Sequence, residues 1–146
     1  MEKSDVDILL VEDSPDDLDL TIMALRETKI AREIATASDG EEALDFLFCK
    51  NQYAGRNPAE QPRLILLDLK IPKIDGIEVL KRIKDDPRTQ QIPVVVLTSS
   101  TRKADLDASY KAGANSYLVK SVDFDQFTRE IKQVGEYWLS LNRAKS

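Results

Sequence analysis

Residues 64–72 read Leu-Ile-Leu-Leu-Asp-Leu-Lys-Ile-Pro, so a run of aliphatic side chains ends abruptly at a carboxylate. Four consecutive aliphatic residues are typical of a strand that is buried on both faces, as in a parallel sheet. Asp68 then lies at the C-terminal end of this strand, which is where ligands bind in open parallel sheets. Aspartate is also common in the turn after a strand, so this residue alone leaves a structural and a functional interpretation open.

Four other segments are predicted to be strands, and each of them is followed by a polar residue. The four segments are residues 8–11, 33–37, 93–97 and 116–119, of which the second is the weakest. The first is followed by Glu12 and Asp13, the third by Thr98 and the fourth by Lys120. Several strand ends therefore carry side chains that are capable of chemistry.

Helical patterns fill the segments between the strands. Ser14 is suited to cap a helix and Pro15 to its first position, while Asp39, Asp75 and Asp123 each precede Glu or Gln by three residues. The predicted helices cover about residues 15–28, a short segment after 39, a segment from 75 to before 87, and about residues 102–112 and 123–141. Residues 50–63 contain Gly and Pro and are predicted to form a long surface loop.

The last predicted helix carries an apolar face. Its residues at alternating spacings of three and four are Phe124, Phe127, Ile131, Val134, Trp138 and Leu141. Such a face is typical of a helix that docks on its own sheet, and a surface for a partner protein is the alternative. Tyr137 and Leu139 lie off this face, so the C-terminal end of the helix is apolar on more than one side.

Five strands that alternate with five helices predict an α/β fold with a doubly wound, five-stranded parallel sheet. The length of 146 residues fits one domain, so residues 1–146 are expected to form a single domain. In the flavodoxin-like strand order 2-1-3-4-5, the first and third strands are neighbours and their C-terminal ends meet. This order brings Glu12, Asp13 and Asp68 into one pocket.

Composition excludes several classes of function. The net charge of -5 and a pI near 4.9 argue against binding to nucleic acid, which usually needs a basic face. Histidine is absent, and this removes Ser-His-Asp catalysis, histidine zinc ligands and histidine acid-base chemistry. No apolar run approaches the length of a membrane span, and the single cysteine, Cys49, excludes an intramolecular disulfide. We therefore expect a cytoplasmic protein without membrane contact.

Three carboxylates in one pocket need a compensating charge. Two like charges about 4 Å apart repel by roughly 4 kcal/mol at an effective dielectric constant of about 20. A hard divalent cation supplies this compensation, and ligands that offer only oxygen favour magnesium (Mg2+) over zinc. Lys120, at the end of the fifth strand, adds a fixed positive charge.

Short motifs follow one another at the predicted strand ends. They are Val11–Ser14, Leu67–Asp68 with Ile71–Pro72 and Asp75–Gly76, Val96–Ser99, Ala112–Ala114 and Leu118–Lys120. Each motif is unspecific alone, but in this order and spacing they resemble the receiver domain of two-component response regulators. The resemblance covers nearly the whole chain.

This resemblance implies a chemical role for Asp68, as the nucleophile that receives a phosphoryl group from a phosphohistidine on a sensor histidine kinase. The absence of histidine from the chain is consistent with a donor on another protein. The resemblance also implies that Glu12, Asp13, Asp68 and the backbone carbonyl of Lys70 bind Mg2+. Phosphoryl transfer depends mostly on positioning and charge stabilisation, so this small set of groups is sufficient.

The resemblance further implies a switch. Lys120 would pair with one phosphate oxygen, and the hydroxyl of Thr98 would move to bind another. Tyr117 would rotate into the space that Thr98 leaves, which would change the surface of the fourth helix, fifth strand and fifth helix. Without the resemblance, Tyr117 would be interpreted as an ordinary half-buried aromatic residue of a strand.

Two residues depart from the family pattern or vary within it. Ser121 stands where the family usually has a proline, often with a cis bond, and a cis bond before serine costs roughly 2.5–4 kcal/mol. Lys70 occupies the position two residues after the nucleophile, where a side chain can influence the access of water. Our hypothesis is that its charge alters the lifetime of the acyl phosphate.

The loop before Asp68 and the end of the last helix, Tyr137–Leu139, resemble a narrower group, the small stand-alone regulators of cyanobacterial and bacterial phytochromes. This resemblance implies a phytochrome as the sensor kinase and no output domain, so that the signal passes to an unidentified downstream protein. It also implies a homodimer through the region of strand 5 and helix 5, which the apolar C-terminal end would suit.

Three other functions are weighed against this interpretation. Aspartyl-phosphate phosphohydrolases need a second Asp two positions after the nucleophile for proton transfer, and this chain has Lys70 there. A nucleotide-binding flavodoxin-like protein would need a Gly-rich phosphate loop after the first strand, which is missing. A pseudo-receiver that serves only as a scaffold would have no need of the intact acidic set with Lys120.

Overall fold

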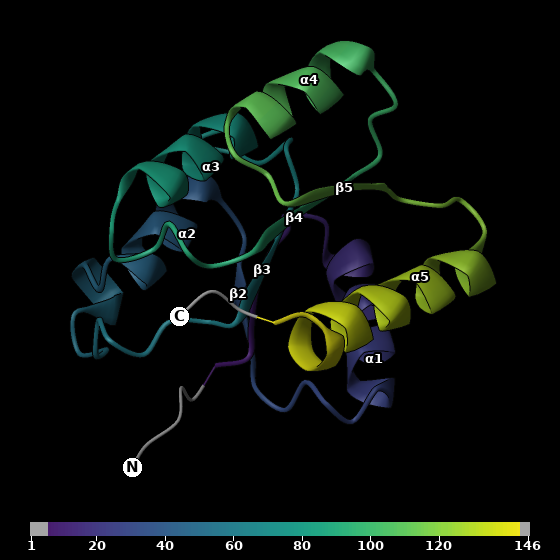
Figure 1. Cartoon of the computed structure of the whole chain (residues 1–146), viewed down its shortest axis with the longest axis horizontal. Coiled ribbons are helices and arrows are strands. Elements are labelled where there is room, and N and C mark those ends of the chain that lie inside the picture. Colours follow the sequence, from purple (N-terminus) through teal and green to yellow (C-terminus); the bar gives the residue numbers. More distant parts are fainter. Residues whose placement is uncertain (1–5, 144–146) are drawn as a thin grey trace.

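Five parallel strands form one sheet at the centre of the computed structural model, which describes residues 6–143 (Figure 1). The strands are β1 (Ile8–Val11), β2 (Ile34–Ala37), β3 (Leu64–Leu67), β4 (Val94–Thr98) and β5 (Ser116–Val119). They lie in the order β2-β1-β3-β4-β5. This order confirms the predicted doubly wound, flavodoxin-like fold.

The three inner strands are buried at every residue, as their uninterrupted aliphatic runs predict. The strand β5 at one edge is only partly buried, and Val119 at its end is exposed. In the parallel register, Val11 of β1 lies opposite Leu67 of β3, so the residues that follow these two strands leave the sheet side by side.

Helices cover both faces of the sheet (Figure 1). One layer contains α1 (Pro15–Glu27) and α5 (Phe124–Glu136), and the other contains α2 (Gly40–Leu47), α3 (Gly76–Asp85) and α4 (Lys103–Lys111). Four of the helices start as predicted, because Ser14, Asp39, Asp75 and Asp123 each accept a hydrogen bond from the backbone N–H three residues later.

The end of the last helix differs from the prediction. The α-helical hydrogen bonds of α5 stop at Glu136, and a π-helical turn, η2 (Tyr137–Leu141), continues the chain. Asn142 N–H donates to the Tyr137 carbonyl five residues earlier at 2.6 Å. The wider turn rotates the helix face, so Leu139 is 5% exposed whereas Leu141, predicted to face the core, is 71% exposed. The predicted apolar face is also wrong at its first residue, Phe124, which is exposed.

The loop of residues 50–63 is more ordered than an irregular surface loop. It contains a 3-10 turn, η1 (Asn51–Tyr53), and the Tyr53 hydroxyl donates to Glu42 Oε2 at 2.7 Å. The Arg56 guanidinium lies 3.8 Å from the centre of the Phe46 ring and donates to the Glu60 carbonyl at 2.6 Å. Side-chain contacts with α2 therefore hold this loop against the domain.

Candidate functional site

The C-terminal ends of β1, β3 and β5 bring the predicted charged residues together at one edge of the sheet. Glu12 and Asp68 follow the paired ends of β1 and β3, and the Asp68 N–H donates to the Val11 carbonyl at 3.0 Å. Lys120 follows β5, and its N–H donates to the Thr98 carbonyl at the end of β4 at 2.7 Å. Backbone hydrogen bonds of the sheet thus set where these side chains leave the strands.

Carboxylates from Glu12, Asp13 and Asp68 offer oxygens that all lie within 4.8 Å of one another. Glu12 is 3% exposed and Asp68 is 8% exposed, whereas Asp13 is exposed. Burial raises the pKa of Glu12 above its ordinary value of 4.5, and the charge of Asp68 adds to this rise while Lys120 opposes it. Loss of contact with water is thus the main factor that disfavours the ionised form of Glu12.

Lys120 lies among three carboxylates. Its Nζ is 2.7 Å from Glu12 Oε1, 2.8 Å from Asp17 Oδ2 and 3.2 Å from Asp68 Oδ2. Burial acts to lower the pKa of this ammonium, but the hydrogen bonds to Asp17 and Glu12 and the charge of Asp68 outweigh burial, so the pKa of Lys120 lies above its usual range. Lys120 therefore stays protonated at neutral pH beside Asp68.

Asp17 is a member of this pocket that sequence reasoning missed. Its place in the first turn of α1 suggested only an acid at the positive end of a helix. In the fold, α1 starts directly above the end of β1, so the third residue of the helix reaches the same edge of the sheet as Lys120. A helix that starts three residues after a functional carboxylate is the signal that could have identified it.

The loop after Asp68 holds the carboxylate from the other side. The backbone N–H of Lys70 donates to Asp68 Oδ1 at 3.3 Å, while the Lys70 side chain is exposed. Gly76, at the start of α3, packs closely on this loop, since a Cβ there would lie 2.6 Å from the Asp68 carbonyl oxygen. A side chain at Gly76 would push the loop and Asp68 away from α3.

Thr98 and Tyr117 meet at Ser100 rather than at Asp68. Thr98 is 1% exposed, and its Oγ1 accepts a hydrogen bond from the Ser100 N–H at 3.3 Å. The hydroxyl of half-buried Tyr117 donates to the Ser100 carbonyl at 3.1 Å, and the Ser100 hydroxyl donates to Asp105 Oδ2 at 2.5 Å. Ser100 therefore joins the two predicted switch residues to the start of α4. Peptide bonds in the described part of the chain are all trans, including the one before Ser121.

The donor set fits a hard divalent cation. Glu12, Asp13 and Asp68 contribute only oxygen ligands, and no His or Cys lies among them. Three carboxylates contact the single ammonium of Lys120, and Asp13 adds a fourth carboxylate to the cluster, which leaves an excess of negative charge for a cation to neutralise. These residues are thus suited to Mg2+ in both ligand type and charge.

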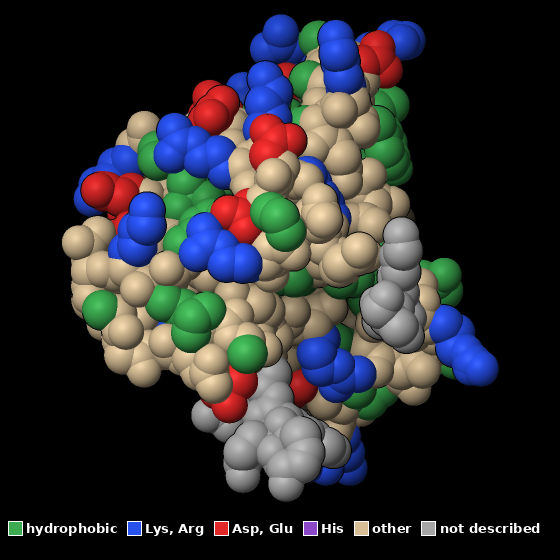
Figure 2. Space-filling view, turned by 60° about the vertical axis from the view of Figure 1, so that its left-hand side comes forward, with side chains coloured by type: hydrophobic (Ala, Val, Ile, Leu, Met, Phe, Trp, Pro, Cys, Tyr) green, Lys and Arg blue, Asp and Glu red, His purple; other side chains and the backbone are tan. Residues whose placement is uncertain are grey.

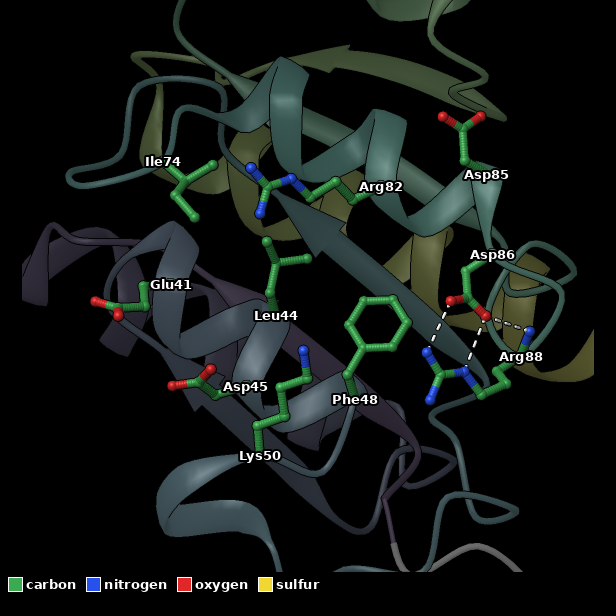
Figure 3. Close-up of a pocket in the computed structure, with 10 residues that line it drawn as sticks. All are labelled: Glu41, Leu44, Asp45, Phe48, Lys50, Ile74, Arg82, Asp85, Asp86 and Arg88. Carbon is green, nitrogen blue, oxygen red and sulfur yellow. Dashed lines mark hydrogen bonds and ion pairs between the residues drawn. The ribbon is translucent and has the colours of Figure 1, made fainter.

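A separate groove of about 490 Å3 lies between α2 and α3, and its lining includes none of the residues of the Glu12, Asp13 and Asp68 cluster (Figure 3). Its charged side chains are largely occupied, because Arg88 pairs with Asp86 at 2.8 Å and lies 4.8 Å from the centre of the Phe48 ring. Acidic and basic side chains are interspersed on this side of the molecule (Figure 2). The groove has no dominant charge and carries none of the chemistry described above.

Comparison with known proteins gives a family match. The response regulator receiver domain matches residues 8–132. The response regulator Rcp1 of Synechocystis is 41% identical over 132 residues, covering 90% of this chain and 88% of Rcp1. FilR2 of Methanothrix harundinacea, described as a probable methanogenesis regulatory protein, is 42% identical over 137 residues, covering 94% of this chain and 86% of FilR2.

Solved structures give a matching result. The phosphorylated cyanobacterial phytochrome response regulator RcpA superposes with a TM-score of 0.89 at 40% identity, covering 97% of this chain and 99% of RcpA. The Mn(2+)-bound form of Rcp1 superposes with a TM-score of 0.88 at 38% identity, covering 97% of this chain and 99% of Rcp1. None of the helices in residues 6–143 is long and apolar enough to span a bilayer.

Proposed function

Since the chain belongs to the response regulator receiver domain family, we propose that Asp68 accepts a phosphoryl group from a phosphohistidine of a sensor histidine kinase. One observation carries this proposal above all others. Asp68 is a buried carboxylate within 3.2 Å of a permanent cation, Lys120, and it shares an oxygen-only cluster with Glu12 and Asp13. Residues 1–146 act in this proposal as one receiver domain.

The transfer step needs a nucleophile and stabilised charge. An oxygen of Asp68 forms a bond to phosphorus, the bond from phosphorus to the histidine nitrogen breaks, and the imidazole leaves with the electron pair. Lys120 pairs with an oxygen of the transferred group, and the N–H of Lys70 holds the second oxygen of Asp68 in position. Positioning and charge stabilisation are the main requirements of such a transfer.

Glu12, Asp13, Asp68 and the backbone carbonyl of Lys70 would hold Mg2+ at this site. The carboxylate cluster supports this assignment, and so does the existence of a Mn(2+)-bound form of the relative Rcp1. When bound, the ion supplies positive charge that neutralises the incoming phosphoryl oxygens.

The output is a change of surface. In the structure, the Thr98 hydroxyl oxygen accepts a hydrogen bond from the Ser100 N–H at 3.3 Å. On phosphorylation, the Thr98 hydroxyl moves toward the phosphoryl group and this hydrogen bond breaks. Because Tyr117 holds the carbonyl of the same Ser100, movement of this residue changes the position of Tyr117 and the surface formed by α4, β5 and α5. A downstream protein reads this surface.

A phytochrome in the cytoplasm is the proposed kinase partner. The similarity to the phytochrome response regulator RcpA over 97% of the chain supports this choice. Candidate phytochrome kinases labelled with radioactive phosphate should transfer it to this chain faster than unrelated sensor kinases do. Equal transfer from both groups would contradict the phytochrome assignment.

A homodimer through β5 and α5 is the proposed assembly. Val119, Val122 and Phe124 are exposed next to one another in sequence at this edge of the sheet. Exposed apolar side chains in this segment would be available to a symmetric interface. A monomer at high concentration in sedimentation, with and without a phosphate mimic, would contradict this part of the proposal.

Lys70 is proposed to tune the lifetime of the phosphorylated state. Its backbone contacts Asp68 while its side chain is exposed beside the nucleophile, so the ammonium can influence the approach of water. Lys70→Ala should therefore change the rate of dephosphorylation, and an unchanged rate would remove this role. Lysine at this position also disfavours a phosphohydrolase, which needs an acid-base carboxylate there.

The proposed function is tested by labelling with acetyl phosphate. Wild-type protein should take up one phosphoryl group in the presence of Mg2+ and none after chelation. Asp68→Asn should take up none, while Asp85→Asn, which removes the same charge from the exposed end of α3, should behave as wild type. Equal labelling of wild type and Asp68→Asn would contradict the proposal, and absence of labelling in both would favour a pseudo-receiver scaffold.

A further inference from the structure

The three acceptors of Lys120 are not equivalent. Glu12 and Asp68 belong to the carboxylate cluster assigned to the cation, whereas Asp17 does not. An ammonium has three N–H donors, and Lys120 directs them to these three carboxylates at 2.7, 2.8 and 3.2 Å. Asp17 is closer to Lys120 than Asp68 is, so Asp17 accepts one of the three hydrogen bonds that the ammonium can donate.

The position of Asp17 is built into the start of α1. Its N–H donates to the cap residue Ser14 at 3.4 Å, and its carbonyl accepts from the Thr21 hydroxyl at 2.7 Å. The Ser14 N–H in turn donates to Glu12 Oε2 at 3.1 Å. The cap that begins the helix is therefore tied to the carboxylate cluster, and this link fixes the distance from Asp17 to the pocket.

We propose that Asp17 is a positioning residue for the divalent cation, because it draws Lys120 toward α1 and leaves oxygens of Glu12 and Asp68 available to the ion. This inference rests on the proposed function and adds to it a residue outside the assigned ligands. Lys120 competes with the cation for the same two carboxylates. A third carboxylate that shares the lysine weakens this competition and adds negative charge beside the ion.

A role for Asp17 as an ordinary helix-start acid predicts a different result. Any carboxylate in the first turn interacts favourably with the helix dipole, and Asp16 meets that condition next in sequence. Asp16 is exposed and has no ion pair among those of residues 6–143. Asp17, in contrast, is 39% exposed and in contact with Lys120. Substitution of Asp16 or of Asp17 by Asn therefore removes the same charge from the start of α1, but only the Asp17 substitution also removes a contact with Lys120.

The experiment is a calorimetric titration of Mg2+, repeated with Mn2+, into the protein of 146 residues without any phosphoryl donor. Asp17→Asn should bind the ion about 10-fold more weakly than wild type, which is the lower end of the range for residues that orient metal ligands. Asp16→Asn should bind as wild type. Asp17→Glu, which keeps the charge, should recover most of the affinity. Circular dichroism and thermal melting show that each variant is folded.

The decisive comparison is made in a Lys120→Gln background. There the loss caused by Asp17→Asn should shrink toward that of Asp16→Asn, because the lysine that Asp17 restrains is gone. An Asp17→Asn protein that binds Mg2+ as tightly as Asp16→Asn would overturn the inference while leaving the metal site intact. Wild-type protein that binds no Mg2+ would instead overturn the metal site of the proposed function, and the inference with it.

Discussion

Different forces hold two regions of the molecule, the pocket around Asp68 and Lys120 and the packing of α1 against α5. In the pocket, Lys120 and its carboxylate partners keep one another in place by ion pairs. Between the helices, Leu25 and Ile131 are fully buried apolar residues. Gly135 permits close approach, since a Cβ there would lie 3.1 Å from Leu25.

Because different forces hold the two regions, function and stability should depend on different residues. The carboxylates of the pocket outnumber its one ammonium and repel one another, so neutralising one of them should not cost stability. Apolar side chains buried between the helices stabilise the fold and are not part of the pocket around Asp68. Substitutions in the pocket should therefore change chemistry, and substitutions between α1 and α5 should change the free energy of unfolding.

The largest expected effect on stability is that of Ile131→Ala. Because Ile131 is 0% exposed, its truncation leaves a cavity and should lower the free energy of unfolding by about 2–5 kcal/mol. Denaturation in urea measures this loss. The initial rate of labelling by acetyl phosphate, measured where the variant is folded, should stay near that of wild type. A much lower labelling rate in folded Ile131→Ala protein would show that the packing of α1 against α5 also affects the chemistry of the pocket.

Addition of Mg2+ should have the next largest effect. A ligand that binds only the folded state stabilises it by about 2.7 kcal/mol at 100 times its dissociation constant. Mg2+ should raise the free energy of unfolding of wild type and of Ile131→Ala by the same amount, whereas it should raise that of Asp68→Asn only slightly. Melting temperatures with Mg2+ and with chelator measure this effect, and an increment that Ile131→Ala lacks would show that the helices support the metal site.

A matched pair of leucines tests the π-helical turn. Leu139→Ala removes a buried side chain near the chain end and should cost about 2 kcal/mol, while Leu141→Ala changes an exposed one and should stay within about 0.5 kcal/mol. Urea denaturation of both variants provides the measurement. A larger cost for Leu141→Ala would mean that α5 continues as a regular helix.

The smallest effect concerns the helix cap of α5. Asp123 accepts a hydrogen bond from the Gln126 N–H at 2.9 Å, so Asp123→Ala should cost about 1 kcal/mol and Asp123→Asn less. Labelling by acetyl phosphate should be unaffected in both variants. A change in labelling without a change in stability would show that the Asp123 cap affects the reaction in the pocket.

The same two regions differ in how far the sequence predicts them. The pocket is predictable because Glu12, Asp68, Thr98 and Lys120 each end a strand whose apolar run is visible, and parallel strands bring their ends to one edge. Asp17 was not predicted, because its contact with Lys120 depends on the position of α1 relative to the sheet. That position is set by packing between distant segments rather than by the local sequence pattern.

The C-terminal end of α5 was predicted less well for a related reason. A spacing of three and four places Leu141 on the buried face only if every turn is α-helical, and the turn at Tyr137–Leu141 is not. Arg63, 76 residues earlier in the chain, donates to the Leu139 carbonyl at this turn. Such a contact between distant segments leaves no periodic signal in the sequence.

The most direct test of the account is to locate the phosphoryl group. Protein incubated with Mg2+ and acetyl phosphate is treated with borohydride to trap the acyl phosphate, and its peptides are mapped by mass spectrometry. We expect modification at Asp68, and the same modification in Ile131→Ala at a temperature where this variant is folded. Modification at another carboxylate of the pocket, such as Asp13, or none at all, would contradict it.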